Sequence, residues 1–175
     1  MKNIVLLGFM GTGKTSVGRL LARQLKRPFV DVDKMIEIAC GAAISEIFQK
    51  HGEKFFREQE SEMIAKAASY ENAVIATGGG VVLNAENIAR LRCNGVLVTL
   101  TASPEVILER TAKRTTRPLL NAPDREQTVK ALLENREPLY QEADYIIDTT
   151  SGSLHQIAQK IIVLLRQGGH LRGRG

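Results

Sequence analysis

The chain has 175 residues, 43% of them hydrophobic and 25% charged, which is the composition of an ordinary soluble globular protein with the length of one domain. No apolar run approaches the roughly 20 residues that span a bilayer. We therefore expect a cytoplasmic location and no membrane partner. The net charge of +5 admits an anionic partner, but the chain lacks Trp and any basic stripe interleaved with aromatic residues, so nucleic acid is not expected.

Short apolar runs alternate along the chain with segments whose apolar residues recur at helical spacing. The runs lie at 4–9, 28–33, 73–77, 95–100 and 144–148. Most are continuous, which is typical of strands covered on both faces, and strands that alternate with helices favour a parallel sheet. An amphipathic segment at 154–166 predicts a last helix behind the fifth strand. The sequence therefore predicts an α/β fold of three layers, with five parallel strands and helices on both faces.

The first apolar run ends in a glycine-rich segment that leads into a helical pattern. Residues 8–15, GFMGTGKT, fit G-x-x-x-x-G-K-[ST], the P-loop pattern, with a strand before it and a helix after it. Glycines let backbone N–H groups turn toward a phosphate, Lys14 can bridge the outer phosphates, and the Thr15 hydroxyl can bind Mg²⁺. A glycine-rich tight turn is the alternative, and the strand-to-helix context favours triphosphate binding. The residues expected to bind ATP here are Gly11, Thr12, Gly13, Lys14, Thr15 and Ser16.

An acidic pair, Asp31 and Asp33, follows the second apolar run. The run at 73–77 ends in glycines instead of the acid with which many ATPases hold Mg²⁺, and the N-K-x-D segment of guanine-nucleotide switches is absent from the sequence. The magnesium acid is therefore expected from this pair, at an edge where ligands bind to parallel sheets. One carboxylate could organise the water shell of the metal, and the other could reach a hydroxyl of the phosphate acceptor. The alternative is that Asp33 caps the following helix, a role that is compatible with a function in the site.

Three further segments have features that need an explanation. Arg57 and Glu60 are three residues apart on a predicted helix and could pair, although a solvated surface salt bridge is the commoner outcome. Three glycines at 78–80 follow a strand, where they make sense if the backbone closely approaches a ligand. The stretch 111–126 is basic and polar with two prolines, so it is either a surface loop or a mobile lid.

These segments together resemble the shikimate kinase family, which are small P-loop kinases of the nucleoside-monophosphate-kinase type. The resemblance covers nearly the whole chain and rests on GFMGTGKT, DVD, GEKFFREQE, TGGGVV, RPLL and REPLYQEAD, in this order. It implies phosphorylation of the 3-hydroxyl of shikimate by ATP with Mg²⁺, in aromatic amino-acid biosynthesis. It also implies a P-loop kinase fold with strand order 2-3-1-4-5 and a mobile lid at about 111–126.

The resemblance implies a role for each residue on the ATP side. Lys14, Asp33 and Arg117 would be catalytic, with Arg117 in the lid closing over the transferred phosphate. Thr15 would bind the metal, and Asp31 would bind it through water. Arg110 would bind ATP near the adenine.

The resemblance likewise implies a set of acceptor-binding residues. They are Asp33, Arg57, Glu60, Gly78, Gly79, Gly80 and Arg136. Within this set, the two arginines would hold the carboxylate of shikimate, and Glu60 would steer Arg57. A guanidinium can hold a carboxylate through two parallel hydrogen bonds, which fixes its orientation as well as its charge.

We expect a single P-loop kinase domain at 1–167, a flexible basic tail at 168–175, and a chain that acts as a monomer. Three other interpretations stay open: a kinase for another small molecule such as gluconate, an ATP-binding regulator without chemistry, and a basic nucleic-acid-binding module. Asp33 and the arginines argue against a regulator, which needs no acceptor pocket. The choice between shikimate and gluconate depends on the shape of the pocket, which a sequence shows poorly.

Overall fold

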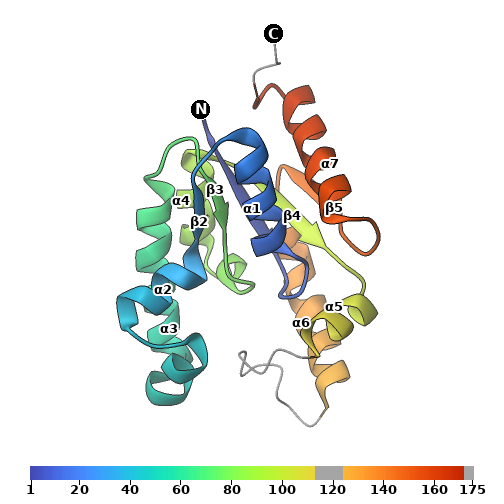
Figure 1. Cartoon of the computed structure of the whole chain (residues 1–175). Helices are drawn as coiled ribbons and strands as arrows, with labels where there is room; N and C mark the ends of the chain where they lie inside the picture. Colours follow the sequence, from blue (N-terminus) through green and yellow to red (C-terminus); the bar gives the residue numbers. More distant parts are fainter. Residues whose placement is uncertain (113–123, 172–175) are drawn as a thin grey trace.

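The computed structural model describes residues 1–112 and 124–171, and its centre is one parallel sheet (Figure 1). The strands are β1 (Asn3–Gly8), β2 (Phe29–Asp31), β3 (Val74–Ala76), β4 (Gly95–Thr101) and β5 (Tyr145–Asp148). They are hydrogen-bonded in the order β2-β3-β1-β4-β5, and every neighbouring pair is parallel. The predicted five-stranded parallel sheet and its order are therefore confirmed.

Helices follow every strand, as a parallel sheet requires of its crossover connections. They are α1 (Lys14–Leu25), α2 (Val32–Cys40), α3 (Ile44–Ala68), α4 (Ala85–Cys93), α5 (Pro104–Thr111), α6 (Arg125–Tyr140) and α7 (Leu154–Gln167), with a short 3₁₀ turn η1 (Val81–Leu83). The path of α3 is interrupted at Gly52, whose φ is +80°. Within the described ranges, no helix is both long and apolar enough to cross a bilayer.

Two hydrophobic cores lie on opposite faces of the sheet. Val5 and Leu7 of β1 face the core that contains apolar residues of α2, α3, α4, α5 and α6. Ile4 and Leu6 of the same strand face the core formed with α1 and α7. Because both faces are covered, residues 4–7 of this strand are all apolar, which explains its continuous apolar run. The predicted three layers are confirmed.

The carboxyl ends of three adjacent strands position the site. β1 leads into the P-loop, β2 ends at Asp31, and β3 is followed by the three glycines at 78–80. Since β3 lies between β2 and β1, these three segments meet at one edge of the sheet.

Two predicted segments lie partly outside the described residues. Thr111 ends α5 and Arg125 begins α6, so the described ends of the predicted lid are helical, while 113–123 lies outside the description. In the predicted tail, residues 168–171 fold back on α7, where the N–H of His170 donates to the carbonyl oxygen of Leu165 at 2.8 Å. Residues 172–175 lie outside the description. The extent of the domain and the tail stays a prediction.

Candidate active site

The P-loop presents backbone donors at the start of α1. Gly13 precedes this helix with a φ of +96°, and no described side chain caps the helix there. The first N–H groups can therefore face an anion, which the positive end of the helix dipole also attracts. Thr15 and Ser16 are exposed in this first turn. Gly8 must lack a side chain, because a Cβ there would lie 2.3 Å from the carbonyl oxygen of Leu100 on β4.

Lys14 lies inside this loop and is only 6% exposed. Its ammonium group donates to the carbonyl oxygens of Gly8, at 2.7 Å, and Phe9, at 2.9 Å. Burial of an ammonium requires such partners, because it removes the charge from water. The Thr12 hydroxyl donates to the same Phe9 carbonyl at 2.7 Å. These bonds hold the lysine charge within the loop, where phosphate oxygens can approach it.

Thr15 and Asp31 bring a hydroxyl and a carboxylate together beside the P-loop. The Thr15 hydroxyl donates to Oδ2 of Asp31 at 3.3 Å, and Oδ1 of Asp31 accepts from the N–H of Lys34 at 3.2 Å. Asp31 is therefore the residue that caps α2, whereas Asp33 lies in the first turn of that helix. The alternative role of Asp33 as the cap is wrong. Oxygen donors of this kind are what Mg²⁺ prefers, so the pair fits a magnesium site.

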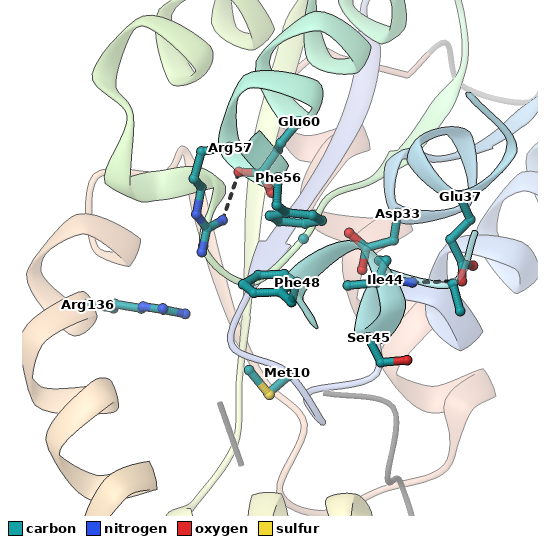
Figure 2. Close-up of a pocket in the computed structure, with 14 residues that line it drawn as sticks. Met10, Asp33, Glu37, Ile44, Ser45, Phe48, Phe56, Arg57, Glu60 and Arg136 are labelled. Atoms are coloured by element: carbon teal, nitrogen blue, oxygen red, sulfur yellow. Dashed lines mark hydrogen bonds and ion pairs between the residues drawn. The ribbon is translucent and has the colours of Figure 1, made fainter. Parts of the chain in front are cut away.

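A cavity of about 230 Å³ lies beside the P-loop (Figure 2). Its apolar wall is formed by Met10 of the P-loop and by Ile44, Phe48 and Phe56 of α3. The two phenylalanine rings have centroids 4.6 Å apart. Its polar lining includes Asp33, Glu60, Arg57, Arg136 and the three glycines at 78–80. All the acceptor-binding residues predicted from the sequence thus line one cavity.

Arg57 and Glu60 form an ion pair at the wall of this cavity. Nη1 of Arg57 donates to Oε1 of Glu60 at 2.9 Å, and Nη2 lies 3.4 Å from the carboxylate of Glu53. Glu60 is only 2% exposed, so the pair is not the solvated surface salt bridge considered as an alternative. Burial raises the pKa of Glu60, and the adjacent Arg57 charge opposes this rise. Within the described residues, Oε2 of Glu60 and Nε of Arg57 are buried without a hydrogen-bond partner.

The three glycines allow the backbone after β3 to pass close to the charged side chains. A Cβ at Gly78 would lie 2.9 Å from both Oδ1 of Asp33 and Oε2 of Glu60. A Cβ at Gly80 would lie 2.4 Å from Nη1 and Nη2 of Arg57. The sequence predicted a close approach to a ligand, and the close contacts in the structure are with the side chains that line the cavity. We call Gly78, Gly79 and Gly80 the glycine loop.

Arg136 reaches the cavity from α6 and is 4% exposed. Its guanidinium carbon lies 5.7 Å from the centroid of the Phe9 ring, a cation–π distance. Figure 2 shows Arg136 and Arg57 entering from one side of the cavity, while Asp33 lies toward the other. The arrangement offers two cations for an acid group and a carboxylate for a hydroxyl at a different place in the same cavity.

Known proteins resemble this chain over nearly its whole length. The family model described as shikimate kinase matches residues 10–166. The shikimate kinase of Caldanaerobacter subterraneus subsp. tengcongensis is 51% identical over 162 residues, which are 93% of this chain and 95% of that protein. That of Thermodesulfovibrio yellowstonii is 54% identical, over 93% of this chain and 94% of its own. This chain belongs to the shikimate kinase family.

Solved structures agree with the family assignment. A shikimate kinase from Acinetobacter baumannii, in complex with shikimate, is 43% identical, with a TM-score of 0.93 over 96% of this chain and 94% of that one. A gluconokinase from Sinorhizobium meliloti is 20% identical, with a TM-score of 0.62 over 95% of this chain and 92% of its own. At that identity, the second likeness shows the fold alone. The resemblance to shikimate kinases stated from the sequence is confirmed.

Arg110 and Thr149 connect the P-loop of this shikimate kinase family member to the end of β5. Arg110 donates to the carbonyl oxygen of Gly11 at 3.2 Å and to that of Thr149 at 2.6 Å. The Thr149 hydroxyl lies 2.9 Å from the carbonyl oxygen of Thr12. The structure thus places Arg110 against the P-loop. Sequence reasoning missed Thr149, for which no local pattern gives a signal, and Arg117 lies outside the described residues.

Proposed function

We propose that this chain transfers the γ-phosphoryl group of ATP to the 3-hydroxyl of shikimate, in the shikimate pathway of aromatic amino-acid biosynthesis. Its membership of the shikimate kinase family supports this function. The observation that carries the proposal is one cavity beside the P-loop in which Asp33 faces the two arginines Arg57 and Arg136. A flat cyclic acid with ring hydroxyls matches such a cavity, because its carboxylate and its hydroxyls point in different directions.

On the acceptor side, we assign binding of the carboxylate to Arg57 and Arg136. Asp33 orients the 3-hydroxyl and can accept its proton as the oxygen attacks the γ-phosphorus, with ADP as the leaving group. Glu60 holds the Arg57 guanidinium through the bond to Oε1. The glycine loop and the apolar wall of α3 enclose the ring of the substrate.

On the ATP side, we assign the phosphates to the N–H groups of Gly11, Thr12 and Gly13, to the start of α1 at Thr15 and Ser16, and to Lys14. Phosphoryl transfer needs positioning and neutralisation of charge more than covalent chemistry. We propose from the family resemblance that Arg117 neutralises the transferred group and that the lid excludes water, which would otherwise hydrolyse ATP. Arg110 is assigned to the nucleotide through its place against the P-loop.

We propose Mg²⁺ as the metal cofactor, held by the Thr15 hydroxyl and, through water, by Asp31. Their oxygen atoms lie 3.3 Å apart, and hydroxyl and carboxylate oxygens suit this hard cation. When bound, Mg²⁺ neutralises charge on the phosphate oxygens. We further propose that the protein acts in the cytoplasm as a monomer, with ATP and shikimate as its partners.

The test is ADP release from Mg-ATP with shikimate, with gluconate, and without an acceptor. Release that depends on shikimate alone is expected. Release with gluconate alone would retain the P-loop chemistry and overturn the assignment of the acceptor. ATP binding without release in any of these assays would instead favour a nucleotide-binding regulator.

A further inference from the structure

A buried tyrosine connects α6 to the glycine loop. Tyr140 is the last residue of α6 and is 4% exposed. Its hydroxyl donates to the carbonyl oxygen of Gly79 at 2.5 Å, across 61 positions of sequence. Burial raises the pKa of Tyr140 to about 12, although the nearby charge of Arg136 opposes the rise. The hydroxyl therefore keeps its proton, and remains a donor, at every pH at which an enzyme of this kind is assayed.

The acceptor of this bond is the middle residue of the glycine loop. A Cβ at Gly78 would collide with Asp33 and Glu60, and one at Gly80 with Arg57, so the loop passes close to three charged groups of the cavity. Gly79 itself lies against the P-loop, where a Cβ would be 3.3 Å from the backbone nitrogen of Met10. A glycine segment has no side chains with which to fix its own conformation. A bond to its centre therefore limits the positions of both flanking residues.

Tyr140 is in turn held in place by the sheet. The hydroxyl of Thr99 on β4 donates to the Tyr140 carbonyl oxygen at 2.8 Å. Pro138 lies in the last turn of α6 and has no N–H to donate, so this turn has one helical hydrogen bond fewer. The bond from Thr99 adds a contact between this turn and the sheet. Arg136 lies one helical turn before Tyr140, on the same face of α6. The end of the helix that carries Arg136 is thus fixed by two hydrogen bonds of Tyr140, one with Thr99 of β4 and one with Gly79 of the glycine loop.

We infer that Tyr140 is a positioning residue for binding of the acid substrate. It fixes the position of the glycine loop relative to Arg136, on the two sides of the cavity. This inference rests on the proposed function. Tyr140 is not among the described residues that line the cavity, so it acts through its neighbours rather than by contact with substrate. The chemistry that it supports is recognition of a carboxylate and ring hydroxyls, because Gly79 and Arg136 both line the acceptor cavity.

The test is Tyr140→Phe, which removes one oxygen and keeps the ring. Loss of a neutral hydrogen bond corresponds to roughly a threefold to tenfold change, so KM for shikimate should rise by about that factor. KM for ATP should stay within about twofold of the wild-type value. Tyr145→Phe on β5 is the matched control, because it makes the same change away from the cavity and should leave both KM values unchanged.

A second control separates positioning from general loss of stability. Ile161→Val in α7 removes a buried methylene on the opposite face of the sheet, so it lowers the melting temperature without contact with the glycine loop. It should leave KM for shikimate unchanged. An unchanged KM for shikimate in Tyr140→Phe would overturn the inference, and so would equal rises in KM for shikimate and KM for ATP. In either case, shikimate-dependent ADP release by the wild type would still support the proposed function. A wild type without shikimate-dependent ADP release would overturn both.

Discussion

The ATP side and the acceptor side of this site are held together in different ways. On the ATP side, the charged and hydroxyl groups of the P-loop bond within the loop, since Lys14 and Thr12 donate to carbonyl oxygens three to six residues earlier in the chain. Its outer face is bonded by Arg110 and Thr149. On the acceptor side, the cavity is lined by residues of several elements, which range in the sequence from Met10 of the P-loop to Arg136 of α6. Those segments are fixed by contacts such as the bond from Tyr140 to Gly79.

This difference indicates how each half responds to change. The residues of the P-loop that are expected to bind phosphate are contiguous in the sequence, so variants there should affect the phosphates directly. The acceptor cavity depends on charged groups and close backbone contacts from several elements. Variants on that side should therefore change affinity for the acid while ATP binding is retained.

The largest effect is expected for Lys14→Ala. Loss of a cation that neutralises the transferring phosphate should lower kcat by about 10³-fold. ADP release at saturating ATP and shikimate measures it. Lys66→Ala, which removes an exposed lysine paired with Glu62 on α3, is the control and should retain full activity. A near-normal kcat in Lys14→Ala would contradict the proposed role.

Asp33→Asn tests the boundary between the two sides. The amide keeps the shape of the side chain but cannot accept the proton, so kcat should fall by about 10²-fold. Equilibrium binding of a fluorescent ATP analogue should be unchanged, because Asp33 lines the acceptor cavity. Phosphoryl transfer at the wild-type rate would contradict its assignment to the hydroxyl.

The P-loop and the sheet could be predicted from the sequence because their signals are local. Residues 8–15 carry a complete motif, and the continuous apolar runs follow from the burial of both faces of strands such as β1. The local rules failed where capping had to be assigned. Asp31 and Asp33 are equally good caps by composition, and only the end of β2 at Asp31 decides between them.

The acceptor cavity could be predicted only through the family resemblance. Residue spacing suggested the Arg57–Glu60 pair but not its burial, which depends on the packing of α3 against the glycine loop. Tyr140 and Thr149 were missed because their partners lie 61 and 137 positions away. For Tyr140 a signal existed, since its spacing of four from Arg136 places both residues on one face of α6.

Arg136→Ala should mainly weaken binding of the acid. Loss of charged hydrogen bonds to a carboxylate corresponds to a rise of roughly tenfold to a hundredfold in KM for shikimate. KM for ATP should change little. Arg90→Ala, which breaks an exposed pair with Glu86 on α4, should leave both constants unchanged. An unchanged KM for shikimate in Arg136→Ala would mean that the carboxylate binds elsewhere.

The smallest effect is expected for Glu60→Gln, and it depends on pH. Because burial raises the pKa of Glu60 above its ordinary 4.5, the folded chain holds this proton more tightly than the unfolded chain. Its contribution to stability is therefore fully present below pH 4.5 and is lost as the pH rises through the raised value. The Gln variant has no such proton to lose. As the pH rises from 4.5 through the raised pKa, the free energy of unfolding of the variant should therefore increase relative to that of the wild type.

Urea unfolding of both proteins between pH 4 and pH 8 measures this difference. The Gln side chain also lacks the charge that holds Arg57, so KM for shikimate should rise even where the variant is the more stable protein. Glu62→Gln, at an exposed position of the same helix, should show neither effect. A difference in stability that stays constant with pH would mean that Glu60 titrates alike in the folded and unfolded chains. The ion pair with Arg57 would then fully compensate the cost of burying the ionised carboxylate, and this charge would not lower the stability of the folded chain.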